Sequence, residues 1–209
     1  MVFYICKTLI LVAILHQAAA GRRKQEDFLE WRDYIDGKLP DTSIVVGRTS
    51  TFPGGIPIYV GLVHVEDGPN EGYLPTNIIG GVIPVNVSLD DETIISFDKN
   101  VKILCGKGHY TTRIFWVQTS QSTFPSVLES DQYRPVFAGW QFGEDNKVTF
   151  NSSIYVGKGT EGQFGANFVG KIYQNHPDPL KNNRLYSPGW YSTVTKFDTF
   201  DSLVWSLVI

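Results

Sequence analysis

The chain has 209 residues, with 18 Lys and Arg against 21 Asp and Glu, and a formal charge of −3. This mildly acidic balance gives no electrostatic reason to expect a nucleic acid or an anionic membrane as a partner. The 20 glycines and 11 prolines are typical of a chain with many tight connections.

The first predicted element is a secretory signal peptide over residues 1–20. Lys7 supplies a weak basic region, residues 8–15 an apolar stretch, and residues 18–20 a small-residue cleavage site. The apolar stretch is shorter than the ~20 residues that a spanning helix needs. We therefore expect a secreted, extracellular product without membrane insertion. Cleavage would leave 189 residues with 17 basic and 21 acidic side chains, a formal charge of −4.

Cys105 would be the only cysteine of that mature chain, so no intrachain disulfide is expected. It alternates with Val101 and Ile103 along one strand face, which favours burial over a reactive thiol or an intermolecular bridge. The three histidines of the mature chain are scattered and give no zinc-ligand spacing. No metal or cofactor is therefore expected.

Beyond an N-terminal tail at residues 21–30, short runs rich in Val, Ile, Tyr and Thr predict strands between Gly, Pro and Asp turns. The segment around Trp31 fits either a short helix or a strand. The expected strands are 43–46, 56–65, 78–87, 93–97 and 101–105, then 114–117, 137–142, 148–156, 168–173, 191–196 and 203–208. Because the connections are too short for parallel crossovers, the sequence predicts an all-β fold with antiparallel sheets.

Landmark residues recur in one order about 85 to 100 positions apart, which indicates a tandem repeat. In each copy a Trp precedes a Pro by nine positions. The Pro is followed by a Gly, then by the run Ile-Tyr-Val-Gly, and then by Phe-Asp. The landmarks are Trp31, Pro40, Gly47, 58–61 and 97–98, and then Trp116, Pro125, Gly139, 154–157 and 197–198. We expect a first unit at 31–113 and a second at 114–209.

The second unit carries insertions before Gly139 and at the polar segment 143–153, and another exposed loop is expected at 176–183. Surface loops tolerate extra length and often carry recognition. The acidic pairs 90–91 and 144–145 fall in expected turns, where solvated carboxylates are usual. No serine elbow accompanies the histidines. We therefore expect no enzyme, with glycoside hydrolysis as a distant alternative.

Aromatic residues make up 13% of the chain and alternate with polar loops, a combination that suits sugar binding. A ring packs on the apolar C–H face of a sugar while fixed polar groups order the hydroxyls. Trp31 and Trp116 are interpreted as structural anchors at the unit starts, whereas Trp140 fits either binding or packing. Asn86 and Asn151 begin N-glycosylation sequons, which predict a glycoprotein.

The landmarks over residues 31–209 together resemble two DM-nine repeats, an extracellular β module that also forms the lectin part of natterin-like proteins. The resemblance implies two β units related by pseudo-twofold symmetry and recognition of mannose-type glycans on microbial surfaces, a role in innate immunity. It places the ligand contacts at Gln141 and Lys171 in the second unit and at Thr49 and Asn77 in the first. Gln141 and Thr49 stand where the family has an acidic residue.

The family's arginine after Tyr-Val-Gly is Leu62 in the first unit and Lys158 in the second. We therefore predict a lectin-like, carbohydrate-binding protein that uses Trp140, Gln141, Lys158 and Lys171, with a homodimer or a multivalent target supplying avidity. The alternative is a secreted structural or protein-binding module, of the saliva, venom or gut type, that has lost sugar binding.

Overall fold

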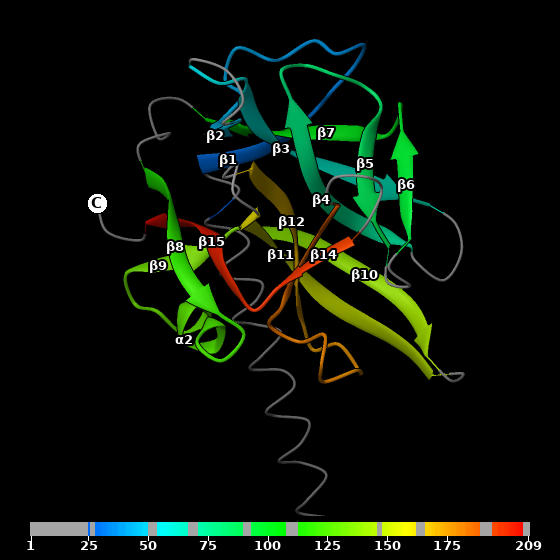
Figure 1. Cartoon of the computed structure of the whole chain (residues 1–209), viewed down its shortest axis with the longest axis vertical. Helices are drawn as coiled ribbons and strands as arrows, with labels where there is room; N and C mark the ends of the chain where they lie inside the picture. Colours follow the sequence, from blue (N-terminus) through cyan, green and yellow to red (C-terminus); the bar gives the residue numbers. More distant parts are fainter. Residues whose placement is uncertain are drawn as a thin grey trace, which may run out of the picture.

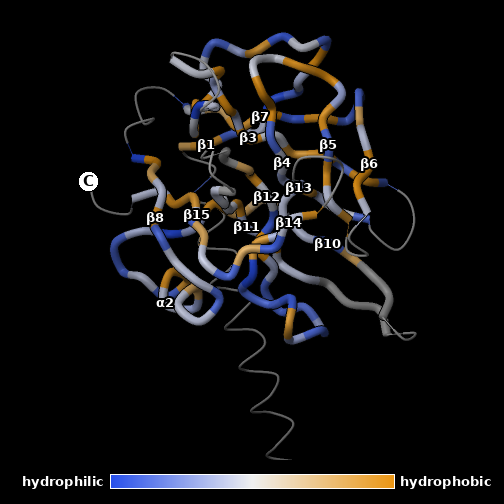
Figure 2. Tube along the Cα trace, viewed as in Figure 1, coloured by the Kyte–Doolittle hydropathy of each residue, from blue (hydrophilic) through white to orange (hydrophobic). Residues whose placement is uncertain are grey.

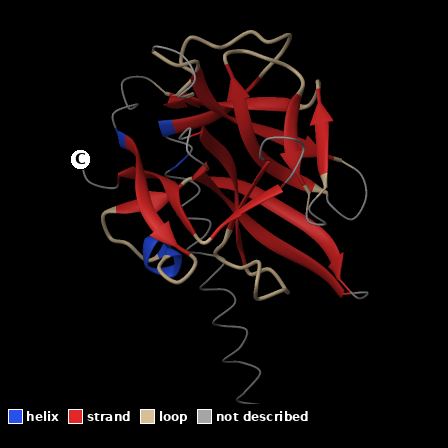
Figure 3. Ribbon diagram, viewed as in Figure 1, coloured by secondary structure: helices blue, strands red, loops and turns tan. Residues whose placement is uncertain are grey.

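The computed structural model describes residue 25 and residues 28–49, 54–66, 71–89, 93–107, 113–145, 148–161, 166–188 and 194–206. The signal-peptide prediction lies outside these residues. Strands dominate, and a short helix lies beside them (Figure 3). All the strand pairs are antiparallel, which confirms the all-β prediction. No helix in the described ranges is long and apolar enough to cross a membrane.

We call the described residues 25–107 the first half and 113–206 the second half. The first half contains β1 (Leu29–Asp33), β2 (Val45–Arg48), β3 (Pro57–Val65), β4 (Gly72–Ile79), β5 (Val85–Ser88), β6 (Ile94–Phe97) and β7 (Val101–Gly106). The second half contains β8 (Ile114–Ser120), α2 (Phe124–Leu128), β9 (Tyr133–Pro135), β10 (Phe137–Asp145), β11 (Val148–Glu161), β12 (Ala166–Gln174), β13 (Leu185–Pro188), β14 (Val194–Phe197) and β15 (Thr199–Ser206). Figure 1 shows β10 and β11 as a long hairpin.

Most strand pairs of the first half have a counterpart in the second. In the first half β3 pairs with β2, β4 and β7, while β7 pairs with β1 and β5 with β6. In the second half β11 pairs with β10, β12 and β15, while β15 pairs with β8 and β13 with β14. The registers also agree, because Trp31 lies opposite Leu104 and Trp116 opposite Leu203. Trp31 and Trp116 therefore occupy equivalent positions in these two strand pairs.

The hydrophobic residues that the structure describes form three cores. One contains buried residues of the first half alone, a second contains residues of the second half alone, and the third, which we call the shared core, takes residues from both. Alternation along β3 explains this division. Ile58, Val60 and Leu62 belong to the shared core, whereas Tyr59 and Val63 belong to the first-half core. Figure 2 shows hydrophobic colour along such strands and hydrophilic colour in many connections.

Several predicted element bounds were wrong. The expected strand 78–87 is two strands, β4 and β5, because Gly80 and Gly81 adopt positive φ in a turn between them. The segment around Trp31, which the sequence left open between a helix and a strand, is the strand β1. The insertion before Gly139 contains α2 and β9, and residues 144–145, expected in a turn, are the last residues of β10.

Candidate ligand-binding site

Gln141 and Lys171 come together, but inside the protein. Their side chains are 0% and 1% exposed. The Lys171 ammonium donates to Gln141 Oε1 at 3.1 Å and to the carbonyl oxygen of Ser88 at 2.7 Å. The Tyr173 hydroxyl also donates to Gln141 Oε1, at 2.9 Å. These contacts connect β10 and β12 of the second half to β5 of the first half, so both predicted ligand residues have structural partners.

Strand alternation explains why Lys171 is buried. It lies on β12 between Val169 and Tyr173, two residues of the shared core, and residues two positions apart on a strand lie on the same face. The first half covers that face. The sequence predicted a strand over 168–173 and, through the family resemblance, a ligand contact at Lys171, because the local pattern does not show that both faces of β12 are covered.

Lys158, another predicted ligand residue, is held by neighbours in the second half. Its ammonium lies 3.1 Å from Asp201 Oδ2 and 4.8 Å from the ring centroid of Trp116. Its side chain is 15% exposed. The indole nitrogen of Trp116 in turn donates to the carbonyl oxygen of Val46 at 2.8 Å. Trp116 is thus an anchor between the halves, and Lys158 covers its ring.

Thr49 and Asn77 are the first-half residues that correspond to Gln141 and Lys171. Each accepts a hydrogen bond from a different backbone amide. Thr49 Oγ1 accepts from the amide of Ile56 at 3.0 Å. Asn77 Oδ1 accepts from the amide of Val169 at 2.7 Å. Within the described residues no contact joins Thr49 to Asn77, so the first half has no counterpart of the contact between Gln141 and Lys171.

A pocket of about 320 Å³ lies elsewhere, where β1, β3 and β7 of the first half meet the start of β10. We call it the inter-half pocket. Its aromatic lining residues are Trp31, Tyr73, Phe137 and Trp140, and its polar ones are Gln25, Glu30, Lys102 and Lys107. Of the predicted ligand residues it includes Trp140. Trp140 and Gln141 are neighbours on β10, yet only Gln141 is fully buried.

The aromatic side of this pocket is held in place by packing and hydrogen bonds. The rings of Phe137 and Trp140 are 4.9 Å apart between centroids, in an edge-to-face arrangement. Tyr73 stacks on His64 at 4.4 Å. Gln25 accepts from the Phe137 amide at 2.8 Å and donates to the Phe137 carbonyl oxygen at 2.9 Å. Groups fixed in this way lose little freedom when a ligand binds.

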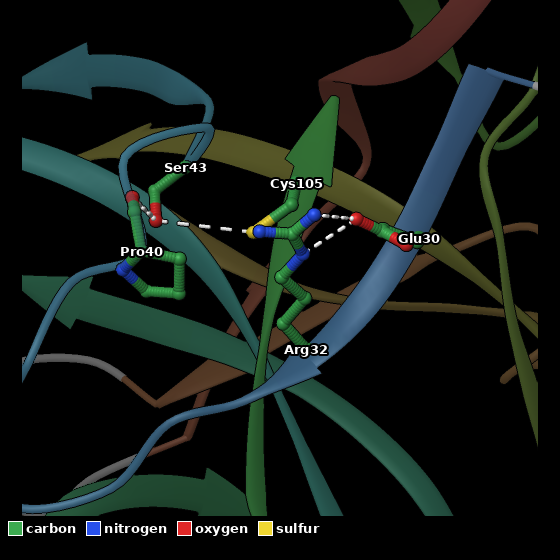
Figure 4. Close-up of polar contacts among 5 residues, drawn as sticks. All are labelled: Glu30, Arg32, Pro40, Ser43 and Cys105. Carbon is green, nitrogen blue, oxygen red and sulfur yellow. Dashed lines mark hydrogen bonds and ion pairs between the residues drawn. The ribbon is translucent and has the colours of Figure 1, made fainter. Parts of the chain in front are cut away.

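Charged side chains at the pocket are also oriented by neighbours. Arg32 forms an ion pair with Glu30, as Figure 4 shows. The Lys102 ammonium lies 2.7 Å from Asp33 Oδ1. Glu30 and Lys102 remain 29% and 38% exposed. Lys102 lies on the same sheet face as Trp31 and is therefore positioned and accessible as a hydrogen-bond donor for a ligand, whereas Glu30, opposite Cys105, lies on the other face of β1.

Sequence reasoning missed most of this pocket. It interpreted Trp31 as an anchor and singled out none of Gln25, Glu30 and Lys102. Trp31 and Lys102 lie on one face of the sheet formed by β1 and β7, because Trp31 is opposite Leu104 and Lys102 opposite Asp33. The available signal was Trp31 and Asp33, two positions apart on β1, together with Lys102 on the same sheet face. The pairing of β1 with β7 was needed to recognise it.

Cys105 is a free, fully buried thiol, which confirms its predicted burial. Ser43 Oγ lies 3.9 Å from the sulfur and donates to the Pro40 carbonyl oxygen at 2.6 Å (Figure 4). In the part of the chain that the structure describes, no three His, Cys, Asp or Glu residues form a group that could hold a metal ion.

The two sequons lie on strands. Asn86 is exposed on β5, and its Oδ1 accepts from the Ser96 hydroxyl at 2.6 Å. Ser88, the third residue of that sequon, is 2% exposed. Asn151 lies on β11 opposite Phe142. The predicted loop 176–183 is largely accessible, but His176 within it is buried at 5% exposure.

Comparisons with protein-family models, with curated proteins and with solved structures found nothing that matches this chain. The inter-half pocket and the sequence resemblance to DM-nine repeats are therefore the two observations from which a function can be proposed.

Proposed function

We propose that this chain is a secreted, non-enzymatic carbohydrate-binding protein and that the inter-half pocket holds the sugar. The observation that carries the proposal is that Trp31 and Trp140, one from each half, line one pocket with positioned polar groups. An indole ring packs on the C–H face of a sugar, while Lys102 can donate to its hydroxyls. Ligand pockets span roughly 300–1,000 Å³, so this one suits a single sugar unit.

The resemblance to DM-nine repeats supports two further parts of the proposal. It favours mannose-type glycans of microbial or cell surfaces as the first ligands to test, and it favours a tandem duplication as the origin of the matching strand pairs. One small pocket binds a monosaccharide weakly, so useful affinity requires a multivalent target or a homodimer. Gln141 and Lys171 connect the halves in this proposal and do not contact the sugar.

The test is glycan-array binding followed by calorimetric titration of residues 21–209. We expect Trp31→Leu and Trp140→Ala each to weaken binding about tenfold, equivalent to about 1.4 kcal/mol of lost stacking. Phe115→Ala is the matched control, because Phe115 is also an exposed aromatic residue, at 41%, but does not line the pocket. Absence of glycan binding, or unchanged affinity in both tryptophan variants, would contradict the proposal.

A second candidate, a structural or protein-binding module, is favoured by one observation. The positions that bind sugar in the resembling family, Gln141 and Lys171, are buried and bonded to protein groups. Elution from mannan-agarose by free sugar would support the first function, whereas co-precipitation of a protein that free sugar does not displace would support the second. Incubation with oligosaccharides, followed by a reducing-end assay, tests hydrolysis.

A further inference from the structure

Three pairs of residues occupy equivalent positions in the halves but differ in their surroundings: Trp31 and Trp116, Leu62 and Lys158, and Lys102 and Asp201. Trp31 and Trp116 lie opposite Leu104 and Leu203 in matching strand pairs. On the next strand, Leu62 lies opposite Lys102, and Lys158 lies opposite Asp201. The two ends of the shared core can therefore be compared residue by residue.

At the second-half end, protein groups bind the indole nitrogen of the tryptophan and lie over its ring. The Trp116 indole nitrogen donates to the Val46 carbonyl oxygen, and the Lys158 ammonium lies over the ring. Asp201 fixes that ammonium at 3.1 Å. A cation on an aromatic face is attracted by the ring, and partial burial strengthens both this attraction and the ion pair. A sugar could stack on Trp116 only by displacing Lys158.

At the first-half end, the same positions leave a pocket. Leu62 replaces the lysine, and Lys102 replaces the aspartate and forms an ion pair with Asp33 instead. Ala138 is the counterpart of Val46 and lines the pocket with Trp31. Within the described residues, no hydrogen bond from the Trp31 indole corresponds to the one that Trp116 makes. The tryptophan at this end therefore has room for a ligand.

We propose that the Trp116 end is a second binding site of the same kind, closed by Lys158, and that the residues at positions 62 and 158 decide which end accepts a ligand. The ligand class, a sugar, rests on the proposed function, whereas the closure of Trp116 by Lys158 does not. One chain then offers one open site, and loss of the lysine makes it bivalent.

The test replaces the closing ion pair by neutral residues, in Lys158→Leu combined with Asp201→Asn. Acrylamide quenching of tryptophan fluorescence is measured in this variant and in the wild type, each with and without Trp116→Phe, so that the Trp116 contribution is isolated. We expect its quenching constant to rise at least about twofold, because the ring loses its cover. Titration with the sugar that the wild type binds should change from one site per chain to two.

Three further variants control the result. Lys158→Arg keeps a cation over the ring and should remain closed, with one site. Lys158→Met is the alternative should the double variant unfold. The reverse change, Leu62→Lys with Lys102→Asp, should close the inter-half pocket and weaken sugar binding at least about tenfold, and its unfolding midpoint is measured alongside because Leu62 belongs to the shared core.

Unchanged quenching of Trp116 in a folded variant would overturn the closure, and a single site per chain in that variant would overturn the second site. If the wild type binds no sugar, the proposed function fails, and the quenching of Trp116 alone then decides whether Lys158 closes this end.

Discussion

The ammonium nitrogen of Lys171 lies 3.1 Å from the amide oxygen of Gln141, and both side chains are buried between the halves. A buried ammonium is costly unless hydrogen bonds replace its hydration. Gln141 and the Ser88 carbonyl oxygen supply two of those bonds. The residues that the family resemblance marks as sugar contacts therefore stabilise the interface between the halves.

Lys171→Ala is expected to lower the free energy of unfolding by about 3 kcal/mol, because it leaves a cavity and a buried carbonyl oxygen without this donor. Urea unfolding at neutral pH measures the change. Lys38→Ala is the control, because Lys38 is exposed, and we expect it to stay within about 0.5 kcal/mol of the wild type. Equal midpoints for the two variants would show that the buried contact contributes no stability.

Gly170→Ala should be among the most destabilising single methyl additions in the chain. A Cβ at Gly170 would overlap the carbonyl oxygen of Tyr186 and lie 2.7 Å from Ser187 Cα, so β12 and β13 would have to separate. A Cβ at Gly47, by contrast, would have Ile58 Cδ1 as its nearest atom, at 3.9 Å. We expect a loss of more than about 3 kcal/mol for Gly170→Ala and about 1 kcal/mol or less for Gly47→Ala. Similar thermal midpoints in the two variants would contradict this packing.

Stability should fall between pH 10 and 12 because burial raises the pKa of Tyr155 from 10.0 to about 12. In that range the unfolded chain has released the proton while the folded chain keeps it, so unfolding becomes easier as pH rises. The stability is complete below about pH 10, and roughly 2 to 3 kcal/mol is lost by pH 12. Burial, and then Tyr59, also raise the pKa of Tyr34, in the same direction.

Tyr155→Phe separates the two tyrosines. It removes the hydrogen bond from the Tyr155 hydroxyl to Gln174 Oε1, so the variant should be about 1 kcal/mol less stable at pH 8. Its loss of stability between pH 10 and 12 should be clearly smaller than in the wild type. Denaturant unfolding at pH 8, 10 and 11.5 gives both numbers, and parallel curves for the two proteins would disprove the role of Tyr155.

Cys105 should resist thiol reagents in the folded protein. Its side chain is fully buried, and a reagent reaches a buried sulfur only through opening of the surrounding structure. With a protein of residues 21–209, we expect Ellman's reagent to react with Cys105 at least about a hundredfold faster in 6 M guanidinium chloride than in native buffer. Rapid reaction without denaturant would mean that the sulfur is accessible.

The sequence by itself determined the strand-rich, antiparallel character of this protein. The run 56–65 alternates between two apolar faces and became β3, which packs on two cores. The repeated landmarks could also be read from the local sequence. A Trp near the start of each half and a Gly at each bulge fit the same kinds of strand pair, and so they recur at matching registers.

Only the tertiary structure decided which of the singled-out residues face a ligand. A period of two shows that neighbours lie on opposite faces of a strand, but it does not show what covers each face. Lys171 is buried because the first half packs on its face of β12, and the Lys158 ammonium lies over the Trp116 ring, whereas Leu62 stands at the matching position beside Trp31. These outcomes depend on contacts between residues far apart in sequence, which no local pattern contains.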